Sequence, residues 1–75
     1  MKAIEIFTGP NCAYCEQAKA LMEQHELEYI VRDISDPEVM REFKARLPRH
    51  RALPQMFADG EHIGSLEDLR LTLKQ

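Results

Sequence analysis

The sequence predicts a small α/β domain in which a four-stranded mixed sheet has helices on both of its faces. Three observations support this prediction. Residues 2–8 and 27–32 alternate apolar with polar side chains, as strands do, and the segments that follow them repeat their apolar residues at helical spacing. Asp59 and Gly60 separate two further short strand-like stretches, which is typical of an antiparallel hairpin. The predicted order of elements is β-α-β-α-β-β-α.

The first strand and the first helix are separated by a Gly-Pro-Asn break. Ile4 and Ile6 share one face of the strand predicted at residues 2–8, and residues 9–11 end that strand. A helix is then predicted over residues 13–25. Its apolar stripe consists of Cys15, Ala18, Leu21, Met22 and His25.

The second strand is predicted at residues 27–32, and a second helix begins at the Ser-Asp-Pro-Glu stretch, residues 35–38. Two starts are open: Asp36 caps the helix with Pro37 at its first position, or the Ser and Glu of the stretch form a capping box. The helix stops before Pro48. Its buried stripe is predicted to be Val39, Met40, Phe43 and Leu47.

The last third of the chain is predicted to form the hairpin and a final helix. Strands at residues 55–58 and 61–63 make the hairpin. Ser65, with Asp68 three residues later, opens the helix. The apolar face of this helix is predicted to be Leu66, Leu69 and Leu73. At the other end of the chain, a right-handed crossover is predicted to join the first two strands in parallel.

Length and charge restrict the function. A chain of 75 residues is predicted to be a single domain, residues 1–75, and to act as a monomer. Its net charge of -3 argues against a general nucleic-acid binder, and it has no apolar run long enough to span a bilayer. The opening MKAIEIF lacks the features of a secretory signal, so we expect a cytoplasmic protein.

Cys12 and Cys15 form a C-x-x-C pair, which suits a structural disulfide, a metal site or a redox pair. A reducing cytoplasm and the very small loop disfavour a structural disulfide. His25, His50 and His62 lack the spacing of a second ligand pair, so no metal is predicted, and His25 is interpreted as a residue of the helix C-terminus. C-x-x-C beside a βαβ pattern favours redox chemistry.

The two cysteines are predicted to be unequal. Cys12 lies at the start of the first helix, where unpaired N–H groups and the helix dipole stabilise an anion. Such settings lower the pKa of a cysteine from about 8.5 to roughly 3.5–7.5 and make it nucleophilic. Cys15 lies one turn further and begins the apolar stripe, so it should be buried. The pair is therefore predicted to be an exposed attacking thiol and a sheltered resolving thiol.

Four short motifs are spread along the chain. They are CAYC at residues 12–15, Leu53-Pro54 before a strand, DGEHIG at residues 59–64 and LEDL at residues 66–69. Together they resemble a dithiol glutaredoxin, and the likeness covers nearly the whole sequence. The resemblance implies the compact thioredoxin-like fold and a cis Pro54 against the cysteines. From the dipeptide alone, an ordinary trans proline entering a strand stays open.

The resemblance also implies an activity, that of a thiol–disulfide oxidoreductase. Its reductant and cosubstrate would be glutathione, and its substrates would be disulfide-containing or glutathionylated proteins. Cys12 is expected to attack the glutathionyl sulfur, and a second glutathione regenerates it. For dithiol substrates Cys15 is expected to resolve the mixed disulfide.

Five residues are implied to bind glutathione: Tyr14 beside the bound sulfur, Leu53 through its backbone, Pro54, Glu67 and Asp68. The start of the last helix would hold the γ-glutamyl end, with its N–H groups on the carboxylate and Asp68 on the amino group. Two other roles stay open. Tyr14 can pack at the top of the first helix, and Asp68 can complete the cap of the last one.

The chain departs from the family pattern in three ways. It has Gly64-Ser65 instead of Gly-Gly, and Glu67 stands where a Ser or Thr usually helps to hold the carboxylate, so it would repel the ligand unless it points away. The TGPN stretch before Cys12, residues 8–11, carries no Lys or Arg, although a basic residue in that region often meets the glycine carboxylate of the ligand in the family. A basic cluster near the Leu-Pro motif either supplies that missing charge or is a solvated loop; it consists of Arg46, Arg49 and Arg51.

Two other functions remain alternatives. One is a glutaredoxin-like electron donor to ribonucleotide reductase that is itself reduced by thioredoxin reductase. The other is a glutathione-ligated [2Fe–2S] module, in which two chains would each supply Cys12; it arises because Ala13 replaces the proline common between the cysteines.

Overall fold

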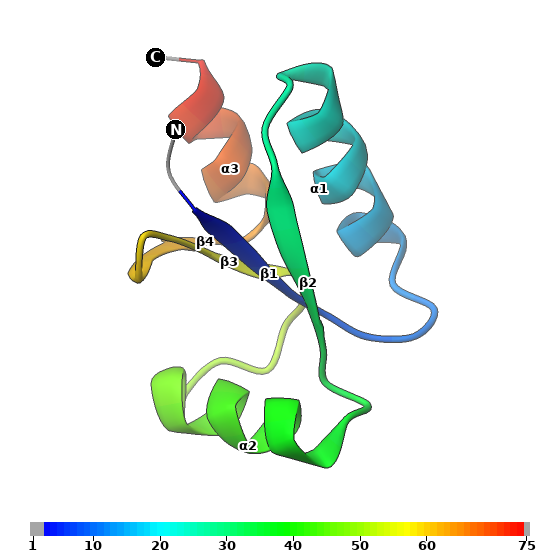
Figure 1. The fold of residues 1–75 in the computed structure, drawn as a ribbon, viewed down its shortest axis with the longest axis vertical. Coiled ribbons are helices and arrows are strands. Elements are labelled where there is room, and N and C mark those ends of the chain that lie inside the picture. The colour runs from blue at the N-terminus through cyan, green and yellow to red at the C-terminus, as the bar shows by residue number, and fades with distance from the viewer. Residues whose placement is uncertain (1–2, 75) are drawn as a thin grey trace.

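The structure is a computed structural model that describes residues 3–74. It contains four strands and three helices in the predicted order (Figure 1). The elements are β1 (Ile4–Thr8), α1 (Ala13–Gln24), β2 (Tyr29–Asp33), α2 (Pro37–Arg46), β3 (Gln55–Ala58), β4 (Glu61–Gly64) and α3 (Leu66–Leu73). No helix within residues 3–74 combines the length and apolar character needed to cross a bilayer.

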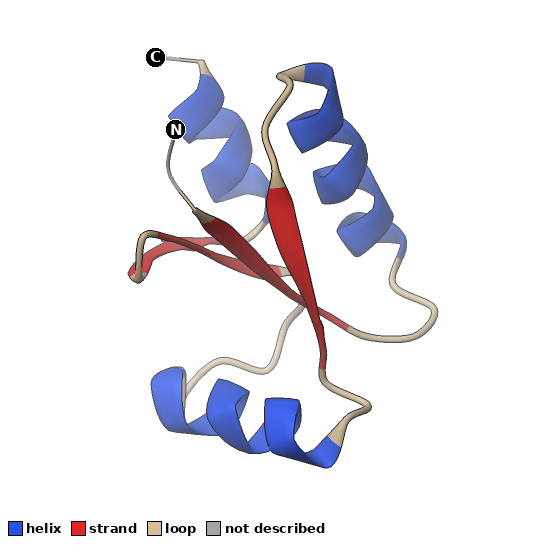
Figure 2. Ribbon diagram, in the orientation of Figure 1, coloured by secondary structure: helices blue, strands red, loops and turns tan. Residues whose placement is uncertain are grey.

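The four strands form one mixed sheet in the order β2-β1-β3-β4. β1 pairs with β2 in parallel, and β3 pairs antiparallel with both β1 and β4. Helices α1 and α3 cover one face of the sheet, and α2 covers the other (Figures 1 and 2). The α/β class, the mixed four-stranded sheet and the helices on both faces are thus confirmed.

The strand boundaries differ from the prediction by one or two residues. β2 runs over Tyr29–Asp33, later than the predicted 27–32, because its register is set by β1: Tyr29 lies opposite Ile4, and Asp33 opposite Thr8. Leu27 instead closes the end of α1 and packs against the core. The predicted first strand began at residue 2, which lies outside the described residues.

Two hydrophobic clusters fill the two sides of the sheet. The cluster under α1 and α3 consists of Ile4, Ile6, Ala18, Met22, Met56, Ala58, Leu66 and Leu69. The cluster under α2 is aromatic, with the ring of Phe7 5.3 Å from that of Phe43 and 5.9 Å from that of Phe57. Burying one such large side chain contributes about 1.5–3 kcal/mol, so both helical layers are tied to the sheet mainly through these contacts.

Arg46 is part of the α2 layer and not of a free basic loop. Its guanidinium lies 5.0 Å from the ring centre of Phe57 and donates to Glu5 at 2.9 Å. Arg32 donates to the same Glu5 at 2.8 Å, and both arginines also pair with Glu42. Because Arg46 is held over the aromatic cluster, only Arg49 and Arg51 of the predicted basic cluster remain without an ion pair among residues 3–74.

The helix starts follow their caps. Asp36 caps α2 by accepting a hydrogen bond from the Glu38 N–H at 2.9 Å, with Pro37 at the first position, which decides between the two predicted starts. At α3, the Asp68 carboxylate accepts from both the N–H and the hydroxyl of Ser65, at 2.8 and 2.9 Å. Each cap is worth about 1 kcal/mol of stability.

The end of α1 contains a strained residue. His25 caps the helix, as its position in the sequence indicated, and Glu26 follows with φ = 56°. The N–H of Glu26 donates to Glu23, and that of Leu27 donates to Met22, which is the Schellman arrangement. Glycine usually occupies this left-handed position because a Cβ costs about 1–2 kcal/mol there.

We predict that Glu26→Gly stabilises the protein. Relief of the left-handed strain outweighs the extra chain entropy of glycine in the unfolded state, so the free energy of unfolding should rise by roughly 0.5–1 kcal/mol. Urea unfolding followed by circular dichroism measures it. Glu28→Gly is the matched control: Glu28 has no positive φ, so only the entropic loss remains and stability should fall. Equal effects of both substitutions would contradict the assignment of strain.

Candidate active site

Cys12 lies where β1 leads into α1. The connecting residues 9–11 pass close to two other segments: a Cβ on Gly9 would lie 3.0 Å from Leu53 Cδ1 and 3.5 Å from Ile34 Cγ1. Asn11 turns the chain with φ = 57°, a conformation that asparagine tolerates better than most residues. The turn brings Cys12 to the N-cap of α1, as predicted, with the loop packed against the segment before β3.

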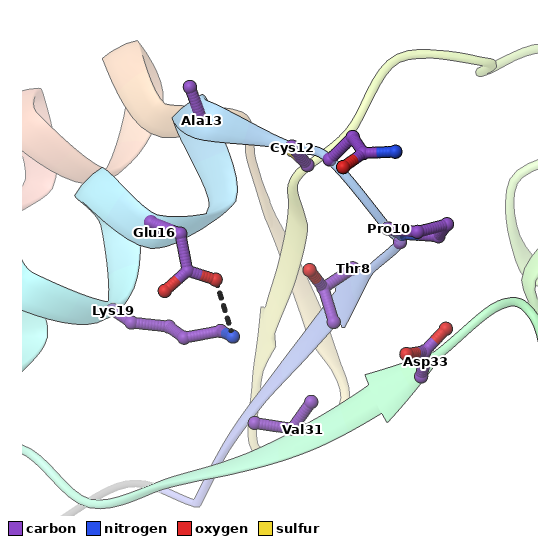
Figure 3. A pocket seen from close by; sticks show the side chains of 10 residues that line it. Thr8, Pro10, Cys12, Ala13, Glu16, Lys19, Val31 and Asp33 are labelled. Carbon is purple, nitrogen blue, oxygen red and sulfur yellow. Dashed lines mark hydrogen bonds and ion pairs between the residues drawn. The ribbon is translucent and has the colours of Figure 1, made fainter.

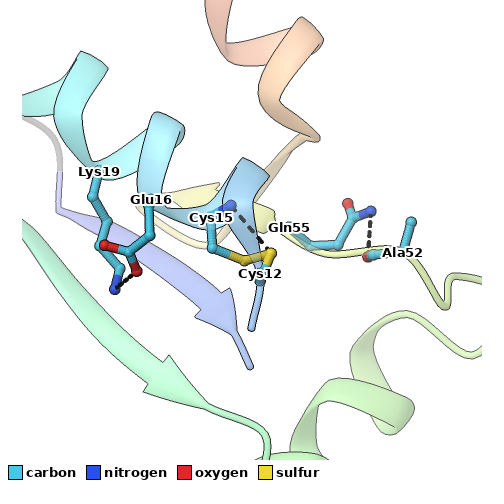
Figure 4. The surroundings of a disulfide bond; sticks show 6 residues. All are labelled: Cys12, Cys15, Glu16, Lys19, Ala52 and Gln55. Carbon is cyan, nitrogen blue, oxygen red and sulfur yellow. Dashed lines mark hydrogen bonds and ion pairs between the residues drawn. A yellow bond between two sulfur atoms is a disulfide. The ribbon is translucent and has the colours of Figure 1, made fainter. Parts of the chain in front are cut away.

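The two cysteines form a disulfide in this structure, with their Cα atoms 5.2 Å apart. Cys15 is completely buried and Cys12 is half-buried, so the predicted inequality of the pair is present. The Cys15 N–H donates to Cys12 Sγ at 3.1 Å (Figure 4). When the disulfide is reduced, this same N–H points at the sulfur that carries the negative charge, which stabilises a thiolate on Cys12.

Leu53 and Pro54 belong to the segment that precedes β3, and this segment forms the second wall of the site. Their peptide bond is cis, as the family resemblance implied. Pro54 is buried, and the Leu53 N–H and C=O make no hydrogen bond to any other residue within 3–74. An extended peptide can therefore pair with the backbone of Leu53 as an added strand would.

A groove of about 330 Å³ lies between the start of α1, the segment before β3 and the first turns of α3. Its lining includes four of the five residues implied to bind glutathione, namely Tyr14, Leu53, Pro54 and Glu67, and continues over Ala52, Ser65, Leu66 and Arg70. Tyr14 is 63% exposed, so it presents its ring to the groove and not to the core. Figure 4 shows Cys12 Sγ on the side of the disulfide that faces Gln55 and Ala52, and Ala52 is one of the residues that line the groove.

Asp68, the fifth residue, is placed differently. It does not line the groove, and its carboxylate is turned toward the preceding turn, where a Cβ on Gly64 would overlap it. The two hydrogen bonds from Ser65 lower the pKa of Asp68, the backbone N–H first and the hydroxyl second. In this structure Asp68 therefore has its alternative role, the cap of α3.

Arg70 is a residue of the groove that sequence reasoning missed. It pairs with Glu67 at 2.6 Å, and it reaches across to α1, where its Nη2 donates to Gln17 Oε1 at 3.3 Å. Glu67 lines the groove, but its charge is compensated and does not stand alone. The signal in the sequence was the spacing of Glu67 and Arg70, because residues three apart on a helix are neighbours.

A second hollow, of about 640 Å³, opens on the other side of Cys12 (Figure 3). It lies between the start of α1 and the ends of β1 and β2, with Thr8 and Asp33 on the strands. On α1, Lys19 pairs with Glu16 at 2.9 Å and closes one side of the hollow. Cys12 lines this hollow, while Cys15 lines neither the hollow nor the groove and is completely buried.

A buried glutamine holds the wall that carries Leu53. Gln55 is only 4% exposed; its Nε2 donates to the Ala52 carbonyl at 3.1 Å, and its Oε1 lies 2.8 Å from His62 Nε2. Because the amide nitrogen faces Ala52, the amide oxygen must accept from His62, which places the proton of neutral His62 on Nε2. Burial lowers the pKa of His62, His50 lowers it further, and Asp68 opposes the change.

We predict that lowering the pH reduces the free energy of unfolding through protonation of His62. A lowered pKa means that the unfolded chain binds the proton of His62 more readily than the folded protein. The contribution to stability is therefore complete above pH 6.5, the ordinary value, and is lost as the pH falls through the folded pKa. His62→Gln should flatten the fall in urea-unfolding free energy between pH 7.5 and about 5.5.

The control for this experiment is His25→Gln. His25 is exposed at the end of α1, away from Gln55, so its removal should leave the pH dependence as in the unsubstituted protein. If both substitutions changed the pH dependence equally, His62 would not be its source.

The histidines do not join the cysteines in a cluster. His50 and His62 stack edge to face with their ring centres 5.2 Å apart, beside Phe57 and not beside the disulfide. Within residues 3–74 no three His, Cys, Asp or Glu side chains converge in a way that would hold a metal ion.

The glutaredoxin family model matches residues 4–63, which is most of the chain. The protein belongs to the glutaredoxin family. Glutaredoxin 3 of Escherichia coli K12 is 33% identical over 69 residues, which cover 92% of this chain and 83% of that protein. Glutaredoxin 1 of Rickettsia bellii is 38% identical over 73 residues, covering 92% and 74%.

Solved structures agree with this membership. The solution structure of glutaredoxin from Brucella melitensis, 35% identical, matches with a TM-score of 0.78 over 99% of this chain and 80% of that one. A buckwheat glutaredoxin–glutathione complex, 20% identical, matches with a TM-score of 0.81 over 97% and 69%, and shows the thioredoxin-like fold alone. This glutaredoxin is a thiol–disulfide oxidoreductase, with Cys12 and Cys15 as its pair.

Proposed function

We propose that this glutaredoxin uses glutathione as its reductant and acts on glutathionylated and disulfide-containing proteins. The observation that carries the proposal is the groove at the start of α1, which Tyr14, Leu53 and Pro54 line and in which Leu53 offers an unpaired backbone N–H and C=O. A groove of about 330 Å³ suits a small peptide and not a folded partner. The cysteinyl part of glutathione pairs with the Leu53 backbone and places its sulfur at Cys12.

The γ-glutamyl end of glutathione reaches the start of α3. The first turn of a helix has N–H groups without partners inside the helix, and these attract a carboxylate. Ser65 and Leu66 line the groove at this point. The buckwheat glutaredoxin–glutathione complex supports the proposal, because it has the same fold as this chain, with a TM-score of 0.81.

Deglutathionylation proceeds through Cys12 alone. The Cys12 thiolate attacks the glutathionyl sulfur of the mixed disulfide, so that one S–S bond forms as the other breaks and the substrate cysteine leaves as a thiolate that takes a proton from water. The Cys15 N–H, 3.1 Å from Cys12 Sγ, stabilises the charge before and after the exchange. A second glutathione thiolate then attacks the Cys12-bound glutathione and releases glutathione disulfide with the Cys12 thiolate.

Reduction of a protein disulfide needs both cysteines. Cys12 attacks one sulfur of the substrate and releases the other as a thiol. Cys15, deprotonated, attacks Cys12 Sγ in the mixed disulfide and releases the second substrate thiol, which leaves the Cys12–Cys15 disulfide that this structure contains. Two glutathione molecules return the pair to the dithiol. The complete burial of Cys15 restricts it to this intramolecular step.

The experiment that tests the proposal compares two sources of electrons. The protein is coupled to NADPH either through glutathione and glutathione reductase or through thioredoxin reductase alone, with a glutathionylated peptide as substrate. We expect turnover only in the first system. Turnover only in the second would replace the proposal with the electron donor reduced by thioredoxin reductase. A coloured dimer after anaerobic reconstitution with iron and sulfide would favour the glutathione-ligated [2Fe–2S] module.

The roles of the two cysteines should be distinguishable in the same assay. Cys12→Ser should lose both activities by at least about a thousandfold, because a hydroxyl is a far weaker nucleophile than a thiolate at neutral pH. Cys15→Ser should keep glutathione-dependent deglutathionylation and lose reduction of protein disulfides. Rates of NADPH oxidation with each substrate measure this. Equal losses in the two variants would contradict the assigned roles, and circular dichroism of both controls for folding.

A further inference from the structure

Gln55 is a buried amide at the start of a strand that is otherwise apolar. The strand continues with Met56, Phe57 and Ala58, all of them buried, and Gln55 itself is only 4% exposed. Burying an amide raises the free energy of the folded state unless its hydrogen bonds are made, so packing alone would favour an apolar side chain here. The partners of the amide indicate what it supplies instead.

One of these partners belongs to the residue just before Leu53. Gln55 Nε2 donates to the Ala52 carbonyl at 3.1 Å (Figure 4). The Ala52 C=O and the Leu53 N–H are the two polar groups of one planar trans peptide unit, so they point in opposite directions. Because Gln55 holds the carbonyl, it also fixes the direction of the Leu53 N–H, which points away from Gln55 and has no partner within residues 3–74.

We propose that Gln55 is a positioning residue for ligand binding, whose amide orients the peptide unit between Ala52 and Leu53 so that the Leu53 N–H is presented to the groove. The inference rests on the proposed function, in which the ligand backbone pairs with Leu53. Gln55 does not line the groove, whereas Ala52 and Leu53 do, so Gln55 acts through them and not by touching the ligand. Without it, binding must also order this peptide unit, which weakens the complex.

His62 decides which end of the amide faces Ala52. The two ends of a glutamine amide have nearly the same shape, and an amide turned by half a rotation would place Oε1 against the Ala52 oxygen, where two acceptors repel each other. His62 Nε2 lies 2.8 Å from Gln55 Oε1 and donates to it, which favours the orientation observed. Neutral His62 with its proton on Nε2 and protonated His62 both carry this N–H, so the orientation of the amide is the same in both states.

The test compares two mixed disulfides of a single cysteine-containing peptide at pH 8. The first carries glutathione, whose backbone can pair with Leu53, and the second carries 2-mercaptoethanol, which has no backbone. The reduced protein is mixed with each, quenched with acid, and the second-order rate constant for release of the peptide thiol is measured. The ratio of the two rate constants reports recognition of glutathione, because the Cys12 thiolate attacks in both reactions. Alkylation by iodoacetamide measures the reactivity of that thiolate alone.

Three variants separate the two hydrogen bonds. Gln55→Met removes both and should lower the ratio about fivefold to tenfold, the size of effect expected for one hydrogen bond. Gln55→Glu, as a carboxylate, still accepts from His62 but has no donor for the Ala52 carbonyl, so the ratio should fall by as much. His62→Phe removes only the group that orients the amide and should lower the ratio about twofold to threefold. The rate of alkylation should stay unchanged in all three.

Ile4→Val is the control for a general loss of stability. Ile4 is buried at the other end of β1, where it pairs with Ala58, the last residue of β3, while Gln55 is the first. Removing a buried methylene there should lower the free energy of unfolding in urea and leave the ratio of rate constants as in the unsubstituted protein. Urea unfolding of every variant shows how far each ratio follows stability.

Two results would overturn the inference while leaving glutathione dependence intact. One is a Gln55→Met protein that keeps the full ratio. The other is a Gln55→Met protein that slows both disulfides and alkylation by the same factor, which would mean that Gln55 only supports the fold. If Gln55→Met does not fold, unchanged ratios in Gln55→Glu and His62→Phe overturn the inference in its place. An unsubstituted protein that reacts equally fast with both disulfides would remove the proposed function, and the inference would fail with it.

Discussion

The junction of β1 with α1 is the constraint on which the rest of the site depends. It holds Cys12 at a helix N-terminus with the Cys15 N–H 3.1 Å from its sulfur, and it buries Cys15 one turn further on. The packing of Gly9 against Leu53 ties this junction to the wall before β3. Cys12 and the backbone of Leu53 are thus fixed relative to each other by one close contact between loops, and the sheet beneath them keeps both in place.

Local signals in the sequence were sufficient for most of the fold. The change from period two to helical period places α1, Asp59-Gly60 places the hairpin, and Asp36 with Pro37 places the start of α2. What these signals could not give was register. β2 begins at Tyr29 and not at residue 27 because pairing with Ile4 decides its start, and that pairing joins residues far apart in the sequence. Ile30 and Val31 look apolar enough for a core, yet both are exposed on this edge strand.

The candidate site was predictable where it depends on the helix start and less so where it depends on side chains meeting across elements. Cys12 and Cys15 lie as their spacing indicated. Arg46 looked like part of a basic loop, but its guanidinium covers an aromatic ring and pairs with Glu5, which lies 41 residues away in the sequence. Arg70 reaches Gln17 over 53 residues, and no local pattern reports such a contact.

The unequal burial of the two cysteines has a consequence for oxidative stress. A hydroperoxide that reaches the reduced protein meets the sulfur of Cys12 alone, because Cys15 has no exposed surface. The sulfenic acid formed there lies beside the Cys15 thiol, and the two condense to the disulfide with loss of water. We expect this capture to compete with further oxidation to the irreversible sulfinic acid. The buried Cys15 thiol thus keeps the oxidation of Cys12 at the disulfide, which a small-molecule thiol can reduce.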